Sequence, residues 1–255
     1  VWGFPMRFLF THALRSHPEQ FTTKKGEMVI KRFCAVTVLF LGVVFLFGQV
    51  HAANEIVIGC IGDYTGTYAA LSKQQKDAVN MAVDEINKAG GLIGRKVRVV
   101  HEDSATQVSM ATQKLERLIL EEKVDFIIPP TTSSAVLAMM PIVEKYNKLM
   151  MVTLAQSVKI TGENKNKQTF RCFANPEITA VPMVNWMMKN LGKRYYLLTV
   201  DYAWGRSASE VYNRLLKEAK AEILGETFFP LNTKDYAPYF GKVKAANPDV
   251  LFIVC

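Results

Sequence analysis

From residue 55 onward, short apolar runs alternate with longer segments in which apolar residues recur every three or four positions. Short runs of this kind predict buried strands, and the spacing i, i+3, i+4, i+7 predicts amphipathic helices. One such helix carries Val79, Ala82, Val83 and Ile86 and ends at Gly90-Gly91, because glycine readily adopts a left-handed conformation. Another carries Val108, Ala111, Leu115 and Leu118. The remaining pattern predicts strands over 56–58, 97–100, 124–128, 149–152, 195–200, 223–228 and 250–254, and helices over 134–147, 177–191, 207–220 and 236–246.

The alternation of strands and helices predicts an α/β fold with parallel sheets. Crossovers between parallel strands are right-handed and place helices over both faces of the sheet. Residues 170–173 and Asn175-Pro176 interrupt the pattern, which then restarts. We therefore expect two Rossmann-like lobes, a first segment of lobe one over 53–174 and lobe two over 175–255. Because the sequence stops in a predicted strand, we expect lobe two to be incomplete and the sequence to be truncated at its C-terminus.

Residues 28–52 have the features of a secretory signal peptide. Lys31-Arg32 precedes an apolar core over 34–48, and small residues, Val50 and Ala52, stand where a signal peptidase cuts. The core is apolar on every face, unlike an amphipathic helix packed on a sheet. An uncleaved anchor is the alternative, although the core is short for a membrane span. Met28 opens a compact positive region, so we expect residues 1–27 to be a non-native upstream extension.

Composition and charge argue against several classes of protein. The chain has 255 residues, 49% of them hydrophobic, which excludes a disordered chain. Its net charge is +8, but residues 1–52 hold six basic and two acidic residues and thus carry half of that net charge. The charge left for residues 53–255 is modest, so nucleic-acid binding is not favoured. Cys60, Cys172 and Cys255 are too scattered for a zinc site or a disulfide framework. With His101 the one histidine after the signal and no hydrolase motif, we expect no enzyme, no metal and no cofactor.

Several short motifs follow one another in an order and spacing that are specific together. They are Thr65-Gly66, Tyr68-Ala69, Glu85-Ile86-Asn87, Gly90-Gly91, Asp103, Ser133-Ser134, Asp201-Tyr202-Ala203-Trp204-Gly205 and Asn247-Pro248-Asp249. From about Glu55 to the end, the chain resembles the type I periplasmic solute-binding proteins of ABC transporters, the leucine-binding-protein-like receptors for branched-chain amino acids, amides and urea. The resemblance implies two α/β lobes that close on a solute in the manner of a Venus flytrap.

The segment Thr131-Thr132-Ser133-Ser134 follows a predicted strand and precedes a predicted helix. Ligands of α/β proteins bind beyond the carboxyl ends of the strands, and a helix N-terminus there favours a carboxylate or amide oxygen. The alternative is a plain N-cap, since Ser and Thr are preferred at that position anyway. The resemblance implies that the Ser133 hydroxyl contacts the solute, with Ser134 beside it. Pro129 stands where the family usually has glycine.

A second candidate loop consists of Leu154, Ala155 and Gln156, after the strand predicted over 149–152. The resemblance implies that a backbone group near Leu154 and a small hydroxyl residue at position 156 hold an amino acid's carboxylate and amino groups. This chain has Gln156 instead, whose amide both donates and accepts but is longer. The departure argues against an ordinary branched-chain amino acid as the ligand. The alternative for Gln156 is a solvent-facing loop residue.

Three further residues are implied by the resemblance. Trp204 matches an aromatic position that packs on the solute from lobe two, Tyr202 is a weaker candidate, and Leu71 matches the apolar end of the pocket. The alternatives are a core aromatic for Trp204 and helix packing for Leu71.

The sequence therefore predicts a periplasmic substrate-binding component of an ABC importer, with a small-molecule solute and permease subunits as partners and no membrane insertion after signal cleavage. The alternative is the ligand-sensing domain of a membrane-anchored receptor.

Overall fold

Strands and helices alternate through residues 55–255, the part of the chain that the computed structural model describes. The proposed extension 1–27 and signal peptide 28–52 lie outside these residues. The strands are β1 (Ile56–Gly62), β2 (Val97–Asp103), β3 (Phe126–Ile128), β4 (Leu149–Val152), β5 (Thr169–Arg171), β6 (Arg194–Asp201), β7 (Glu222–Pro230) and β8 (Val250–Val254). The helices are α3 (Ala69–Lys88), α4 (Val108–Leu120), α5 (Ser133–Lys145), the short 3-10 helix η2 (Val158–Ile160), α6 (Pro176–Asn190), α7 (Ala203–Glu218) and α8 (Ala237–Ala246). None of these helices is long and apolar enough to span a membrane.

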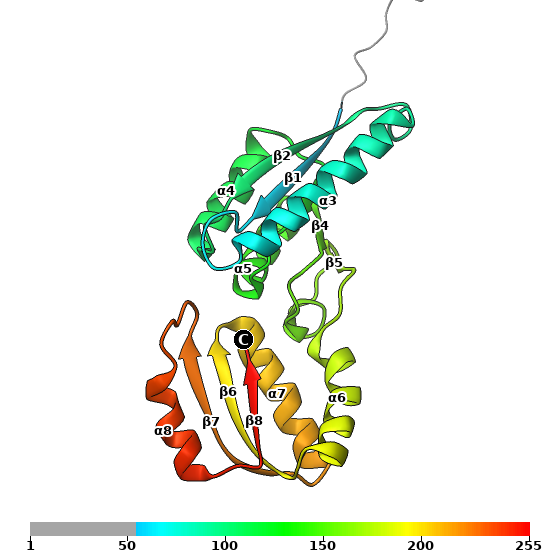
Figure 1. Ribbon diagram of the computed structural model, residues 1–255. Coiled ribbons are helices and arrows are strands. Elements are labelled where there is room, and N and C mark those ends of the chain that lie inside the picture. Colours follow the sequence, from blue (N-terminus) through cyan, green and yellow to red (C-terminus); the bar gives the residue numbers. More distant parts are fainter. Residues whose placement is uncertain (1–54) are drawn as a thin grey trace, which may run out of the picture. The chain divides into compact units, whose positions relative to one another are not determined.

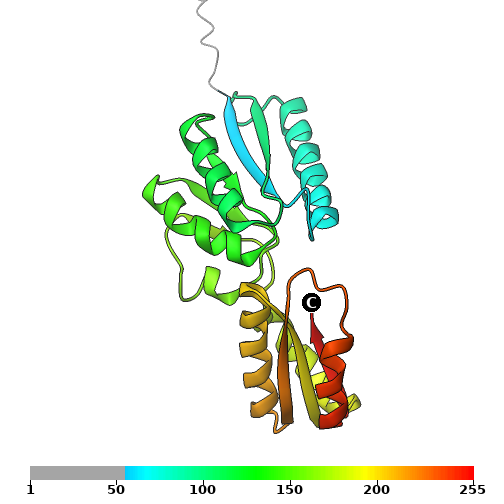
Figure 2. The ribbon, with the colours of Figure 1, turned by 90° about the vertical axis from the view of Figure 1, so that its left-hand side faces the viewer.

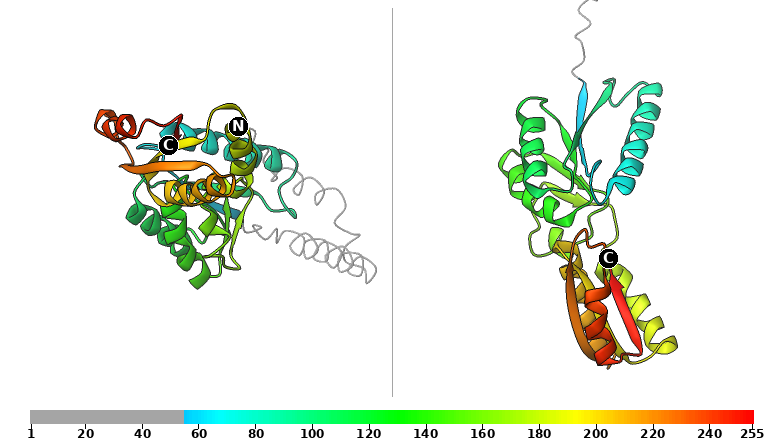
Figure 3. Two further views of the ribbon diagram at one scale, coloured as in Figure 1. Left: turned by 90° about the horizontal axis from the view of Figure 1, so that it is seen from below. Right: turned by 60° about the vertical axis from the view of Figure 1, so that its left-hand side comes forward.

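The first five strands form one sheet in the order β2-β1-β3-β4-β5, and all its pairs are parallel, as the alternation of strands and helices predicts. Helices α4 and α5 lie on one face of this sheet and α3 lies on the other (Figure 2; Figure 3, right). On the α4–α5 side, Ile127 and Met150 of the strands pack with Leu115, Leu118 and Met139 of the helices in one buried cluster. Each of these side chains is fully buried, so this cluster is the main core of the sheet.

The opposite face of the same sheet is covered unevenly within the described residues. The predicted stripe of α3 is half-buried at Val79, Val83 and Ile86, while Ala82 is exposed. Four large apolar side chains of β3, β4 and β5 are also exposed on this face, namely Phe126, Leu149, Met151 and Phe170. The expectation of helices over both faces is therefore met at β1 and β2, where α3 packs. Along β3–β5, no described element covers the α3 side.

The last three strands form a second parallel sheet in the order β7-β6-β8 (Figure 1). The side chains of the central strand β6 alternate between its two faces, as expected of a strand buried on both sides. Tyr195 and Leu197 pack toward α6 and α7, while Leu198 and Val200 pack with Phe229 on the side of α8. All five side chains are buried, so β6 forms the centre of the second core.

Helix α7 begins at Ala203, four residues before the start that the sequence predicts. Trp204 and Gly205 therefore lie in its first turn rather than in a loop. The early start was not predicted because Ala203, Gly205 and Ser207 carry no large apolar side chain to extend the helical stripe. Strand β5 and the short helix η2 were also not predicted as elements, because three residues are too few to establish a period.

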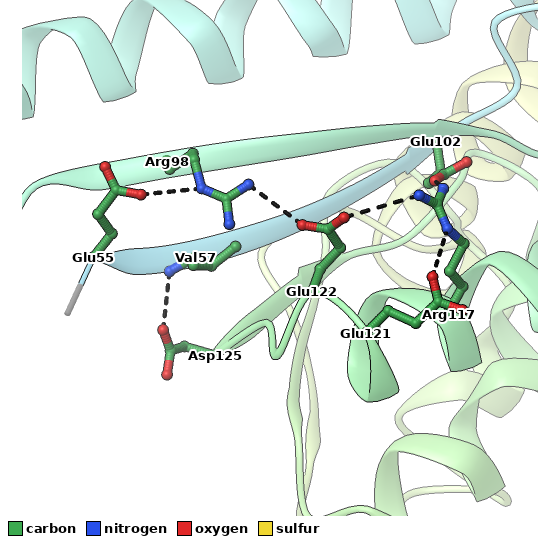
Figure 4. A network of polar contacts seen from close by, with 8 residues as sticks. All are labelled: Glu55, Val57, Arg98, Glu102, Arg117, Glu121, Glu122 and Asp125. Carbon is green, nitrogen blue, oxygen red and sulfur yellow. Dashed lines mark hydrogen bonds and ion pairs between the residues drawn. The ribbon is translucent and has the colours of Figure 1, made fainter.

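A network of ion pairs begins at the amino ends of the strands of the first sheet (Figure 4). Arg98 pairs with Glu55 at 3.1 Å and with Glu122 at 3.5 Å, and Arg117 pairs with Glu102 and Glu121. Most of these groups are well exposed, and exposed pairs add little stability.

The neighbouring contact of Asp125 is structural. Its Oδ2 accepts from the backbone N–H of Val57 at 2.9 Å, and its own N–H donates to the Val57 carbonyl at 2.8 Å. These two bonds fasten the start of β3 to β1.

Candidate functional site

A pocket of about 130 Å³ lies at the carboxyl ends of the strands, the place where α/β proteins bind ligands. Six residues predicted from the sequence line it, and three others join them. The predicted residues are Leu71, Ser133, Leu154, Gln156, Tyr202 and Trp204, and the additional ones are Tyr68, Thr131 and Cys255. The structure thus brings together predicted residues that are up to 133 positions apart, from Leu71 to Trp204.

Ser134 and Ala155, the other two predicted residues, do not line this pocket. The Ser134 hydroxyl accepts a hydrogen bond from the backbone N–H of Ala203 at 3.2 Å. Ala155 is 1% exposed and packs in the core of the first sheet. Ser134 therefore joins α5 to α7, and Ala155 supports the loop from behind.

Three helices begin at the pocket. Tyr68 is the N-cap of α3, Ser133 is the first residue of α5, and Tyr202 is the N-cap of α7. In none of the three does the N-cap side chain accept a hydrogen bond from the helix. The N-terminus of each helix carries a partial positive charge and N–H groups without intrahelical partners. Each of these N-termini favours an anionic oxygen.

Ser133 is oriented by a contact with a neighbouring loop. Its hydroxyl oxygen accepts from the backbone N–H of Ser157 at 3.1 Å. That bond does not use the hydroxyl proton of Ser133, which is left to donate to a solute oxygen. The residue is fully buried, and an electrostatic contact is stronger where water is excluded. Ser133 is therefore suited to donate to a carboxylate.

Asp63 positions the loop that leads to Ser133, and the sequence analysis did not identify it. Its carboxylate accepts from the Thr131 N–H at 3.1 Å and from the Ser104 hydroxyl at 2.6 Å. Its own N–H donates to the Ser72 hydroxyl at 3.0 Å. Burial raises the pKa of Asp63, against these hydrogen bonds, which lower it. The signal available in the sequence was the position of Asp63, an acidic residue directly after the apolar strand β1.

Gln75, also missed from the sequence, ties α3 to two loops of the site. Its Nε2 donates to the Pro129 carbonyl at 3.2 Å and to the Thr153 hydroxyl at 2.7 Å. The loop at Pro129 is thus fixed by a buried side chain. Such a contact spans 54 positions and leaves no local pattern in the sequence.

Aromatic side chains form one wall of the pocket. The ring centroids of Tyr202 and Trp204 are 6.0 Å apart, and those of Tyr68 and Tyr202 are 6.3 Å apart. The Nε1 atom of Trp204 is buried, and no described residue accepts its hydrogen bond. Burial raises the pKa of both tyrosines, so both are neutral hydroxyl donors at physiological pH. The wall combines apolar ring faces with phenolic hydroxyl groups.

A second polar cluster holds the segment between β1 and α3, which leads to Tyr68. The Tyr64 hydroxyl lies 2.8 Å from His101 Nδ1, and His101 Nε2 lies 2.8 Å from Asn80 Oδ1. An amide oxygen only accepts, so Nε2 carries the proton and Nδ1 accepts from Tyr64. Burial, and secondarily the charge of Lys76, lowers the pKa of His101. Protonation of His101 would turn Nδ1 into a donor, so the Tyr64 hydroxyl would have to accept instead of donate.

We expect the protein to lose stability on acidification through this histidine. Because the pKa of His101 is lower in the folded than in the unfolded state, its contribution is present above the ordinary value of 6.5 and is lost as pH falls through the folded value. Urea unfolding at several pH values, over about two pH units near the ordinary histidine pKa, measures this loss. The His101→Gln variant, which does not titrate there, should show a smaller dependence on pH. An equal slope in both proteins would contradict the assignment.

Within residues 55–255, no group of three or more His, Cys, Asp or Glu side chains is placed to hold a metal ion. The three cysteines in this part of the chain are free, and Cys60 is buried within β1.

A family model described as "Periplasmic binding protein" matches residues 55–255, and the chain belongs to this family. The Leu/Ile/Val-binding protein BraC3 of Rhizobium johnstonii is 25% identical over 203 residues, covering 79% of this chain and 54% of the relative. A periplasmic binding protein of Burkholderia mallei superposes with a TM-score of 0.74 at 23% identity, covering 79% and 53% of the two chains. This likeness shows the fold.

A solute-binding protein of an ABC transporter from Rhodopseudomonas palustris BisB5, solved with 3,4-dihydroxybenzoic acid, is 28% identical. Its TM-score is 0.70, with coverage of 78% of this chain and 54% of that one. The chain thus spans about half the length of the relatives it matches. The fold predicted from the sequence, a type I periplasmic binding protein with parallel sheets, is confirmed. The family is one of solute-binding proteins and is not an enzyme class.

Proposed function

We propose that this protein is the extracytoplasmic substrate-binding component of an ABC importer and that it holds a small carboxylate or amide solute. One observation carries the proposal: three helix N-termini and the Ser133 hydroxyl meet at a single pocket of about 130 Å³. Such a pocket has the size of a small metabolite and the polarity of an anion site. The proposed location is the periplasm, after removal of the signal peptide at 28–52.

The proposed mechanism is binding followed by closure. Lobe one, residues 53–174, captures the solute oxygen with Ser133 and the loop carrying Leu154 and Gln156. Lobe two, from residue 175, then closes and brings Trp204 onto the solute. A solute that contacts both lobes favours the closed arrangement by the difference between its affinities for the two states. The permease subunits recognise the closed form, and no covalent step is involved.

The relatives support a carboxylate as the common feature of the solute. BraC3 is named for leucine, isoleucine and valine, and the R. palustris protein holds 3,4-dihydroxybenzoic acid. These ligands differ in their side groups, yet each has a carboxyl group. The helix N-termini and Ser133 provide donors for that group.

Ser133→Ala and Trp204→Ala should each weaken solute binding by about 1–3 kcal/mol, the usual range for a lost buried hydrogen bond or aromatic contact. A thermal-shift screen of aliphatic amino acids, amides, urea and aromatic acids identifies the solute, and calorimetry then measures each affinity. Ser109→Ala and Trp186→Ala are matched controls because both residues are exposed and lie outside the pocket. Unchanged affinity in both pocket variants would refute this site.

A further inference from the structure

Tyr68 and Tyr202 make a direct contact that the sequence analysis did not foresee. Their hydroxyl oxygens are 2.8 Å apart, although the residues are separated by 134 positions. Tyr68 caps α3, which packs on the first sheet, and Tyr202 caps α7, which packs on the second. Both side chains line the pocket. The hydroxyl pair therefore links two helix N-termini inside the binding site.

The pair has one more proton than its internal hydrogen bond uses. Each neutral tyrosine carries one O–H group, and a bond between the two hydroxyls uses only one of them as a donor. The pKa of each tyrosine is raised by burial, so neither loses its proton at neutral pH. The second O–H must find another acceptor. Because both side chains line the pocket, an oxygen atom of a bound solute can be that acceptor.

The surroundings of the pair suit a flat ring. Tyr202 also lies beside Trp204, and tilted aromatic neighbours with centroids 4.5–7 Å apart are a favourable arrangement. Leu71 and Leu154 complete the apolar part of the lining. The volume of about 130 Å³ is close to that of an engineered protein cavity of about 150 Å³ that takes up benzene. The pocket is thus about the size of one aromatic ring.

We propose that the Tyr68–Tyr202 pair is a specificity-determining element and that the solute is an aromatic carboxylate with a ring oxygen. The ring lies against Tyr202 and Trp204, the carboxylate faces the N-terminus of α5, and the ring oxygen accepts the spare phenolic proton. This inference rests on the proposed function, because it specifies which small carboxylate the same pocket selects. It adds Tyr68, which the family-based prediction did not include, to the residues that contact the solute and determine specificity.

The test compares benzoate, 3-hydroxybenzoate, 4-hydroxybenzoate, leucine and isoleucine by calorimetry. We expect one of the hydroxybenzoates to bind about tenfold tighter than benzoate, the effect of one buried hydrogen bond, and tighter than either amino acid. At least one of Tyr68→Phe and Tyr202→Phe should reduce this preference, and the double variant, which keeps neither hydroxyl, should bind benzoate and the hydroxybenzoates equally. Tyr239→Phe is the control, since Tyr239 packs on Phe229 outside the pocket.

The outcomes separate this inference from the proposed function. If leucine or isoleucine binds more tightly than every benzoate, or if the double variant keeps the full preference for a hydroxylated ring, the inference is wrong while the importer role stands. If no carboxylate or amide in the wider screen binds, the proposed function fails as well. Thermal melts of each variant without solute identify any loss of affinity that arises from unfolding.

Discussion

Replacing Gly205 with alanine is expected to destabilise the protein by about 3 kcal/mol, the upper part of the usual range for overpacking a buried site. Gly205 lies in the first turn of α7 and is buried where the helix meets the end of β6. A methyl group at this position would overlap the backbone carbonyl oxygen of Val200, and it would lie 2.8 Å from the Val200 Cγ1 atom. A backbone oxygen in a central strand cannot move aside as a flexible side chain can. The helix must therefore shift outward.

Urea unfolding of the two proteins measures this cost, and Gly241→Ala is the matched control. Gly241 lies inside α8, and an added methyl group there meets no atom within 4 Å. The control should be stabilised by about 1 kcal/mol, since alanine is the better helix former. Opposite signs for the same substitution would establish that α7 sits against β6 as closely as the structure places it. Equal effects would show that the close approach at Gly205 does not exist.

The position of Gly205 also shows where sequence patterns stop being informative. Strand β4 was predicted with its observed bounds, and β8 likewise, because a compact apolar run defines a buried strand. The start of α7 was missed because Ala203, Gly205 and Ser207 carry no large apolar side chain. At Gly205 the lack of a side chain has a reason that only the packing reveals, namely the contact with Val200. A pattern of apolar positions indicates which side chains are buried. It does not indicate where a helix lies close against a strand, because the residue at such a contact has no side chain.

The candidate site was predictable to the extent that it follows from topology and family resemblance. Loops after parallel strands meet at one edge of a sheet, so Ser133 and Gln156 could be placed together. Their supporting residues could not. Asp63, Gln75 and Tyr68 act through long-range contacts, and a hydrogen bond between residues 50 or more positions apart has no period to detect.

Removing the carboxylate in Asp63→Ala is expected to lower the free energy of unfolding by about 3–5 kcal/mol, because two hydrogen bonds to a charged group are lost at about 1.5–3 kcal/mol each. The Thr131 N–H and the Ser104 hydroxyl both donate to this carboxylate. Without it the Thr131 N–H loses its acceptor, and the Ser104 hydroxyl keeps only the Gly62 carbonyl at 3.1 Å. Ser104 and Asp63 are fully buried, so water does not readily replace the missing acceptor. The loss should exceed that of any exposed carboxylate in the same region.

Asp63→Ala should also weaken solute binding in molecules that remain folded, since Thr131 leads directly into Ser133 at the start of α5. Urea unfolding gives the stability, and calorimetry at a temperature well below the melt gives the affinity. Asp77→Ala on the exposed side of α3 is the control and should leave both quantities within about 0.5 kcal/mol, as for most surface substitutions. If Asp63→Ala is as stable as this control, the carboxylate does not hold the loop. If the Asp63→Ala variant is less stable but its folded molecules bind the solute with unchanged affinity, then Asp63 stabilises the fold without positioning Ser133.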